Sequence, residues 1–557
     1  MGGALSAYVH MTMIRNPILP GFNPDPSICR VGEDYYIATS TFEWFPGVQI
    51  HHSRDLVNWR LVRRPLERAS QLDLRGEPDS CGVWAPCLSH ADSKFWLVFT
   101  DVKRFDGAFK DAHNYIVTAP TIEEPWSDPV YVNSSGFDPS VFHDDDGRKW
   151  FVNMVWNHRD YAGAHLKHPA FFGVLLQEWD PISGKLVGSA KNIFPGSQHG
   201  LVEGPHLFKR AGWYYLTTAE GGTGYDHAVT MARSRTIEGP YELHPSVHLM
   251  TSKDASNALL QRAGHGQIVE TPDGQVYHTH LCSRPLKGLR RSPLGRETAI
   301  QKCVWGEDGW LRLAKGGQVP AVEVPAPFAA SATPKPARQT YSFSPDAGLP
   351  IDFQWLRTPH PERIFSLSAR PGWLRLHAQE SIGSWFEQAL VARRQEHFVY
   401  RAETELDFRP RALQHAAGLT AYYNRTKFHC LAVGWDEKFG RSLTILSCEG
   451  DYPAGRLSFP LEEPIRLGGD GPVRLAASVD HASLQFAYAL DGGWRGVGPV
   501  LDASILSDEA GGGEHCSFTG AFVGLVAFGA AGGAISADFR HFAYEGRSRE
   551  EPAPHDE

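Results

Sequence analysis

Three acidic residues, Asp25, Asp138 and Glu203, stand at similar places in similar stretches of this sequence. The stretches are NPDPSICR, FDPSVFHD and VEGPHLFK, and in each the acid precedes a short apolar run. Carboxylates that a repeated fold gathers at one point repel one another, so holding them together is unfavourable unless chemistry uses them. These three residues are therefore the first candidates for an active site.

Hydrolysis of a glycosidic bond is the chemistry that fits such a group. It requires two carboxyl groups beside the scissile bond, of which one protonates the leaving oxygen and the other activates water or attacks carbon. A third acid can keep the pKa of the proton donor high by like-charge repulsion. Asp-Pro pairs also commonly begin turns, and Glu203 before Gly-Pro has the same alternative. The shared position of all three acids favours the catalytic interpretation.

Five stretches of the chain follow this pattern, which predicts the elements that position the acids. Each contains an apolar strand, a turn with Gly or Asp, and an aromatic-rich strand, which together indicate a β-hairpin. The aligned opening residues lie 54 to 65 residues apart, and they are Asp25, Trp84, Asp138, Glu203 and His265. This spacing leaves room for four strands and their loops. We therefore predict a five-bladed β-propeller whose opening residues meet at one mouth of the central channel.

The remaining chain predicts a second β domain. After Leu313 the run AKGGQVPAVEVPAPFAASATPKPARQ is rich in Ala and Pro, which is typical of an extended connector. From about Tyr341 alternating strands resume, which indicates an antiparallel sandwich. We predict an all-β protein with an N-terminal extension, a propeller, a linker, a sandwich and a C-terminal tail, at residues 1–15, 16–313, 314–340, 341–546 and 547–557.

Composition argues against several other classes of protein. Aromatic residues are 11% of the 557 residues, beside 55 Gly and 39 Pro, which suits many short strands and tight turns. The net charge of −9, with no long basic run, argues against a nucleic-acid partner. The longest uncharged stretch, 520–537, is too short and too glycine-rich to span a membrane. We expect a cytoplasmic protein with reduced thiols, because the chain lacks a signal-peptide pattern and its eight cysteines lack disulfide or metal spacing.

An ordered set of motifs resembles the family 43 β-xylosidases. The run from Asn16, NPILPGFNPDPSICRVGEDYYIATSTFEWFPGVQIHHSRDLVNW, is similar to the opening of those enzymes, and VWAP, FDPS, EGPH, GHG and PLGRETAIQ follow in their order. The likeness continues through DFQWLRTP from Asp352 and FTGAFVGL from Phe518. The resemblance implies a five-bladed β-propeller followed by a concanavalin-like antiparallel β-sandwich.

The resemblance also implies roles for the polar residues. Asp25 corresponds to the general base that activates water, Glu203 to the general acid, and Asp138 to the residue that tunes and orients Glu203. Arg296, in the motif GRET, corresponds to an arginine that contacts sugar hydroxyls near the base.

Further positions correspond to sugar-binding aromatics and to a channel histidine. Phe42 and Trp84 match the aromatic walls of the deepest sugar site, and Phe518 matches a loop phenylalanine that the sandwich contributes. Core packing is the alternative for all three. His265 matches a histidine that helps to hold a hydrated cation, often calcium, although the chemistry requires no cofactor. Its alternative is an internally bonded channel histidine, since calcium prefers oxygen ligands.

We therefore expect an exo-acting, inverting 1,4-β-xylosidase that releases xylose from the non-reducing end of small xylo-oligosaccharides, with α-L-arabinofuranosidase side activity. One alternative is an arabinan-degrading hydrolase. The predicted C-terminal sandwich argues against an endo-acting form of it, because such an enzyme needs an open groove. The other is a non-catalytic sugar-binding propeller, in which the acids only hydrogen-bond hydroxyls. The resemblance further implies a homodimer or homotetramer, and we expect neither a nucleic acid nor a membrane as partner.

Overall fold

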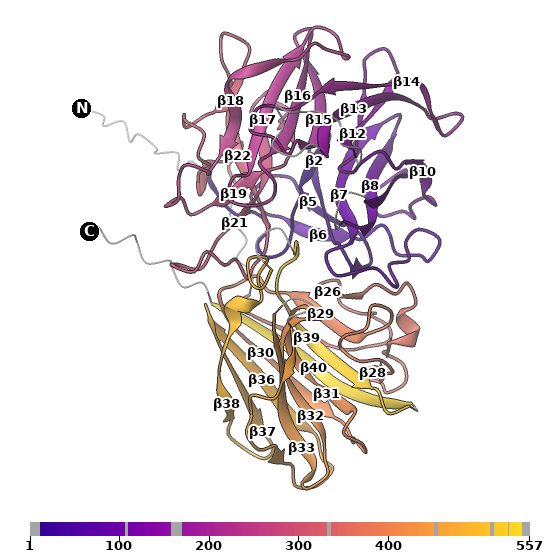
Figure 1. The fold of residues 1–557 in the computed structure, drawn as a ribbon, viewed down its shortest axis with the longest axis vertical. Helices are drawn as coiled ribbons and strands as arrows, with labels where there is room; N and C mark the ends of the chain where they lie inside the picture. Colours follow the sequence, from indigo (N-terminus) through magenta and orange to yellow (C-terminus); the bar gives the residue numbers. More distant parts are fainter. Residues whose placement is uncertain are drawn as a thin grey trace, which may run out of the picture.

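The computed structural model describes residues 12–105, 110–157, 170–330, 336–450, 455–512, 517–532 and 534–547. In this part of the chain the regular elements are β-strands and two 3-10 helices, η1 (Pro361–Arg363) and η2 (Ala503–Ile505), and no helix is long and apolar enough to cross a membrane. Most of the predicted N-terminal extension and C-terminal tail, 1–11 and 548–557, lies outside the described residues. Figure 1 shows the propeller, indigo to magenta, stacked on the sandwich, orange to yellow.

Five antiparallel sheets confirm the predicted propeller. The first blade contains β2 (Ser27–Val31), β3 (Asp34–Thr39), β5 (Gln49–Ser53) and β6 (Arg60–Arg63). The second contains β7 (Gly82–Ala91), β8 (Lys94–Arg104), β9 (Asp111–Ala119) and β10 (Val130–Asn133). The third contains β11 (Ser140–His143), β12 (Lys149–Trp156), β13 (Phe171–Asp180) and β14 (Lys185–Phe194). The fourth contains β15 (Glu203–Arg210), β16 (Trp213–Glu220), β17 (Ala228–Ser234) and β18 (Glu242–Thr251). The fifth contains β19 (Gln261–Gly264), β20 (Ile268–Glu270), β21 (Val276–Ser283), β22 (Glu297–Trp305) and β23 (Leu311–Leu313).

The start of the chain closes the ring by running along β22 of the last blade. Leu19 and Thr298 exchange backbone hydrogen bonds of 3.1 and 3.2 Å, and the Asn23 amide donates to the Arg296 carbonyl at 3.0 Å. A further short strand, β1 (Met13–Arg15), pairs with β24 (Glu323–Pro325). Part of the segment predicted as a linker therefore forms a two-stranded sheet with the N-terminal end of the described chain. Ring closure therefore brings Asp25, which comes just after Asn23, beside the strand that begins after Arg296.

The blade-opening residues share a backbone conformation, with one correction to the alignment made from sequence. The left-handed residues are Asp25, Ala85, Asp138, Gly204 and His265, with φ of 55°, 34°, 55°, 56° and 44°. The first four each precede a proline, and this marks the true register. Trp84 and Glu203 therefore stand one residue earlier than their counterparts. They pair within their blades, Trp84 with Thr100 and Glu203 with Ala219, whereas Asp25 and Asp138 lie before β2 and β11.

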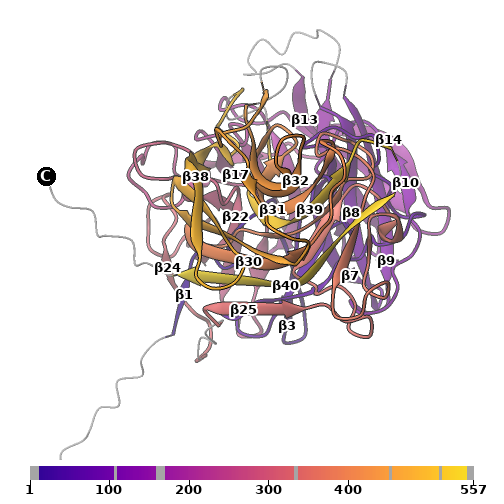
Figure 2. The same cartoon turned by 90° about the horizontal axis from the view of Figure 1, so that it is seen from below.

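The C-terminal domain is a sandwich of two antiparallel sheets, which Figure 2 shows end-on over the propeller. One sheet contains β25 (Arg338–Ser342), β27 (Phe365–Ser366), β28 (Leu374–Ala378), β30 (Val399–Asp407), β36 (Val473–Asp480), β37 (Ser483–Ala489), β38 (Arg495–Asp502) and β40 (Ile535–Arg547). The other contains β26 (Phe353–Leu356), β29 (Ala389–Arg394), β31 (His415–Asn424), β32 (Lys427–Asp436), β33 (Gly440–Glu449), β34 (Leu457–Ser458), β35 (Ile465–Arg466) and β39 (Phe522–Gly529).

The second sandwich sheet ends in a strand that belongs to the propeller. This strand, β4 (Trp44–Phe45), lies between β3 and β5 in the chain and pairs with β26 through Trp355 and Leu356. The Trp44 ring stacks on the Phe522 ring, with centroids 3.7 Å apart and planes 11° from parallel. Both side chains are completely buried in one apolar cluster that contains residues of both domains. The two domains thus share a sheet and a core.

This shared core predicts a large stability loss in Trp44→Ala. We expect the free energy of unfolding to fall by about 3–5 kcal/mol, the usual range for truncating a large buried aromatic. Urea unfolding followed by circular dichroism measures the change. Trp435→Ala is the control, since its side chain is 37% exposed in the same sandwich sheet and should change stability by about 0.5 kcal/mol or less. Equal effects of the two substitutions would show that the interdomain core contributes little.

Candidate active site

Asp25 is fixed by a hydrogen bond or ion pair on each carboxylate oxygen. Its Oδ1 accepts from Arg296 Nη1 at 2.8 Å, and its Oδ2 accepts from Ser40 Oγ at 2.7 Å. Ser40 Oγ in turn accepts from the Ala85 amide at 2.7 Å, so the second blade fixes the hydroxyl that orients Asp25. Asp25 is only 5% exposed, and Arg296 supplies its counter-charge. The result is a buried, oriented and charge-compensated carboxylate.

Asp138 and Glu203 form a buried acidic pair, and within the described residues no lysine or arginine forms an ion pair with either carboxyl group. Asp138 Oδ2 accepts from the Gly204 amide at 3.0 Å and thereby holds the backbone next to Glu203. Burial and the charge of Asp25 raise the pKa of Glu203 to about 8, against smaller opposing effects of Arg296 and Lys110. Burial, Glu203 and Asp25 likewise raise the pKa of Asp138. Glu203 can therefore hold a proton at neutral pH.

His265 lies against this pair, and Gly204 makes the contact close. A Cβ on Gly204 would be 2.9 Å from the His265 ring, and φ at Gly204 is 56°, so glycine fits both demands. His265 Nδ1 is 3.9 Å from Asp138 Oδ2, and burial lowers the pKa of the imidazole. Calcium takes six to eight oxygen ligands. Within the described ranges no three His, Cys, Asp or Glu residues are placed to hold a metal, so this donor set does not fit a protein-built calcium site.

A cluster of aromatic rings lies beside the polar group. Trp84 is partly exposed, and its ring lies 5.7 Å from each of the Phe42 and Phe518 rings. Phe105 and Phe137 approach the same indole at 5.9 and 5.4 Å. Phe42 is buried, and the Arg296 guanidinium lies 5.4 Å from its ring centroid. Trp84 and Phe518 thus have rings available to a ligand, whereas Phe42 mainly supports Arg296 and Trp84.

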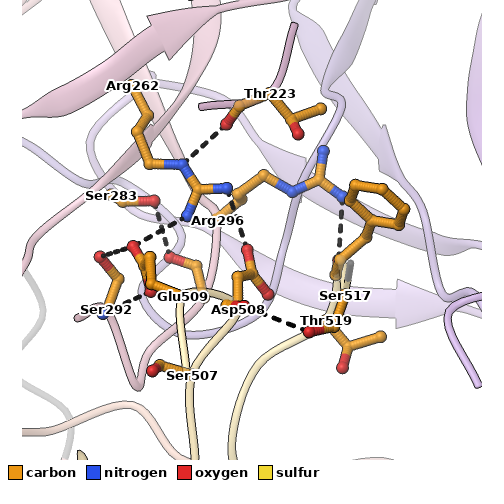
Figure 3. Close-up of polar contacts among 12 residues, drawn as sticks. Thr223, Arg262, Ser283, Ser292, Arg296, Ser507, Asp508, Glu509, Ser517 and Thr519 are labelled. Carbon is orange, nitrogen blue, oxygen red and sulfur yellow. Dashed lines mark hydrogen bonds and ion pairs between the residues drawn. The ribbon is translucent and has the colours of Figure 1, made fainter. Parts of the chain in front are cut away.

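The sandwich contributes Phe518 through a loop that contacts both domains. The Phe518 amide donates to Ser80 Oγ at 3.0 Å, and its carbonyl accepts from Arg296 Nη2 at 2.9 Å. Figure 3 shows the neighbouring polar contacts, with Arg262 directed toward Asp508 and Glu509 of the same loop. Residues 513–516 of this loop lie outside the described residues. Phe518 is therefore part of the group around Asp25 and not of a remote surface.

The structure brings together all the residues singled out from sequence: Asp25, Phe42, Trp84, Asp138, Glu203, His265, Arg296 and Phe518. Sequence reasoning missed Ser40, Phe105, Lys110 and Phe137. Phe137 could have been found, because it directly precedes Asp138 in FDPS. No sequence pattern indicated that Ser40 or Lys110 belongs to the site. Ser40 is placed by contacts between blades, and Lys110 acts on Glu203, which is distant in the chain. An acid with raised pKa and an ionised carboxylate, both buried beside aromatic rings, can perform acid–base chemistry on a sugar.

Comparison with known proteins gives matches along the whole chain. The family model described as glycosyl hydrolases family 43 matches residues 14–311, and the model described as the beta xylosidase C-terminal concanavalin A-like domain matches residues 340–545. Xylosidase/arabinosidase 43B of Humicola insolens is 60% identical over 537 residues, covering 96% of this chain and 98% of that protein. A xylan 1,3-beta-xylosidase of a Vibrio species is 44% identical, covering 96% and 99%.

The fold also has a similar counterpart among solved structures. The crystal structure of xylan beta-1,4-xylosidase from Bacillus halodurans has a TM-score of 0.91 and 49% identity. It covers 96% of this chain and all of that one. Both domains, and the way they are joined in one chain, are therefore common to this protein and that structure.

Proposed function

Because the chain belongs to glycosyl hydrolase family 43, we propose that it is an exo-acting, inverting β-xylosidase that releases xylose from the non-reducing end of xylo-oligosaccharides. One observation carries the proposal: three carboxyl groups converge in the propeller, and among the described residues Arg296 forms its ion pair with Asp25 and with neither of the other two. This arrangement supplies one ionised base and one protonated acid. The relatives' names, xylosidase/arabinosidase and xylan beta-1,4-xylosidase, support the substrate class and an arabinofuranosidase side activity.

The two reactive groups act on opposite sides of the anomeric carbon. Asp25 takes a proton from a water molecule, whose oxygen forms the new bond to carbon. Glu203 gives its proton to the glycosidic oxygen as that carbon–oxygen bond breaks, and the electron pair of the broken bond stays on the leaving sugar. Asp25 ends protonated and Glu203 ionised, so a proton returns between turnovers through solvent.

Asp138, Arg296 and Ser40 act by positioning. Asp138 holds the Gly204 amide next to Glu203, and its proximity favours the protonated form of the pair. Ser40 and Arg296 each bind one oxygen of Asp25 and fix the carboxylate plane. Arg296 keeps further N–H donors that can meet sugar hydroxyls.

The alternatives differ in the substrate or in the absence of chemistry. An arabinan-degrading hydrolase would prefer arabinan fragments, and a sugar-binding propeller would bind but not cleave. The linkage is a further choice, because relatives carry the names 1,3-xylosidase and 1,4-xylosidase. We favour the 1,4 linkage, since the chain is more similar to the 1,4-xylosidase structure. Rates on 1,4-xylobiose, 1,3-xylobiose and arabinobiose distinguish these cases.

Glu203→Gln tests the acid. It should slow hydrolysis of xylobiose by about 100-fold or more, the usual scale for general acid catalysis. Aryl xylosides with good leaving groups should lose much less, because their departure needs no proton. Steady-state kinetics on both substrates measures the difference, and Asp25→Asn is the control because it should slow both substrates alike. Equal losses in Glu203→Gln would remove the acid role.

The same residue sets the expected pH dependence. Glu203 must be protonated to act, and its pKa is raised to about 8, so kcat/KM for xylobiose should fall as the pH rises through this value. For aryl xylosides the fall should be weaker. A fall centred near pH 4.5, the ordinary pKa of a glutamic acid, would mean that the site does not raise the pKa of Glu203.

Stereochemistry tests the role of Asp25. If Asp25 activates water, its carboxyl group should lie about 6.5 to 9.5 Å from that of Glu203, the range associated with inversion. Proton NMR of the first-formed xylose from a β-linked substrate should then show the α-anomer. First formation of the β-anomer would make Asp25 a nucleophile.

The cation suggested for His265 has its own test. The carboxyl chemistry requires no metal, and the protein donors beside His265 do not fit a calcium cage. We therefore expect dialysis against EDTA to leave kcat on xylobiose unchanged. Calcium and magnesium added back separately are the controls. A loss of activity that calcium alone restores would instead indicate an ion held largely through water.

A further inference from the structure

The loop after η2 is anchored to the propeller by a buried ion-pair group. Arg262 Nη2 donates to Asp508 Oδ2 at 3.0 Å, and Nη1 donates to Glu509 Oε1 at 3.2 Å. Arg262 and Asp508 are both fully buried, and Arg262 Nε donates to the Thr223 carbonyl at 2.7 Å. Glu509 also accepts from the Ser292 amide and hydroxyl at 2.9 and 3.0 Å. One propeller arginine thus holds two acids of the sandwich (Figure 3).

Two sandwich residues connect this anchor to the other arm of the same loop. The buried Lys427 ammonium donates to the Ser507 and Ala510 carbonyls on one arm and to Ser517 Oγ on the other, at 2.8 to 3.1 Å. Tyr423 donates to Asp508 Oδ1, and its hydroxyl accepts from the Thr519 amide at 3.0 Å. The position of Asp508 is therefore linked to that of Phe518, which lies between Ser517 and Thr519.

Phe518 is the point at which this loop meets the proposed sugar site. Its ring contacts Trp84 and its carbonyl accepts from Arg296, which also binds Asp25. A continuous series of hydrogen-bonded contacts therefore runs from Arg262 through Asp508, Tyr423 and residues 517–519 to Arg296. Arg262 itself forms hydrogen bonds or ion pairs with Thr223, Asp508 and Glu509, and not with Asp25, Glu203 or Asp138.

We propose that Arg262 is a positioning residue for sugar binding, which acts through Asp508 to hold Phe518 and Arg296 in place. The inference rests on the proposed function. A buried ion pair adds little net stability over apolar packing, and fixing one arrangement is its better-attested use. The backbone of Arg262 is left-handed, with φ of 56°, which is a further constraint on this residue. Phe518 and Arg296 contact the sugar before and during reaction, so loosening them should raise KM more than it lowers kcat.

Asp508→Asn and Arg262→Lys test the proposal in the full-length protein. Asp508→Asn is the milder change, because Arg262 keeps Glu509 as an ionised partner. We expect KM for xylobiose to rise about 10-fold in each variant, within the roughly 100-fold loss that a displaced positioning group can cause. Hydrogen exchange of the 517–521 amides should accelerate in both. Arg291→Gln is the matched control, since this partly exposed arginine bonds Ser504 and Asp502 at the edge of the same interface.

A double-substitution cycle separates positioning from a general structural role. If Arg262 acts through Phe518, Arg262→Lys combined with Phe518→Ala should lower kcat/KM by less than the product of the two single effects. Independent, multiplying effects, or unchanged KM and exchange in folded Asp508→Asn, would overturn the proposal. Wild-type protein without activity on any xyloside would overturn the proposed function instead, while the exchange measurement would still test the anchor.

Discussion

The position of one guanidinium group governs this structure. Arg296 binds the Asp25 carboxylate with one nitrogen and the Phe518 carbonyl with another, so it needs both the closed propeller ring and the docked sandwich. The backbone of Arg296 takes part in closure itself, since its carbonyl accepts from the Asn23 amide. The guanidinium group can bind Asp25 and Phe518 together because its donors form a rigid planar fork. Loss of ring closure and loss of docking would each free Arg296 from one of its contacts and so loosen the guanidinium group that binds Asp25.

This single cation also divides the work among three acids of similar intrinsic strength. Asp25 has a counter-charge and a hydroxyl donor, whereas Glu203 has burial and the negative field of Asp25. The environment of Glu203 favours its protonated form, whereas Asp25 is paired with a cation, and such a difference lets one site hold an acid and a base at one pH. The charges of Glu203 and Asp25 also raise the pKa of Asp138. The Asp138 carboxyl group accepts a hydrogen bond from the Gly204 amide and so holds the backbone next to Glu203.

The sequence contained enough information for the propeller and the carboxylates, because both repeat. Four blade openings carry a proline after the left-handed residue, so the offset at Trp84 and Glu203 could have been found by aligning the prolines, and the strand pairing shows it directly. Ser40 could not be predicted, since its hydroxyl bridges Asp25 and Ala85 from different blades. The pairing of Trp44 and Phe45 with residues of the sandwich was equally hidden, because two residues leave no periodicity. The features that could not be predicted from the sequence depend on contacts between residues that are far apart in the chain.

The β4–β26 pairing has a consequence for synthesis on the ribosome. The Gln354 side chain donates to the Pro46 carbonyl across 308 residues, beside the strand pair. At ~5–20 residues per second, roughly 15 to 60 seconds pass between the emergence of the two partners. During that interval Trp44 and Phe45 have no strand to pair with, and an apolar edge faces the solvent. The nascent propeller must therefore be protected or remain partly open until the sandwich emerges, so translation speed and chaperone access bear on the yield of native protein.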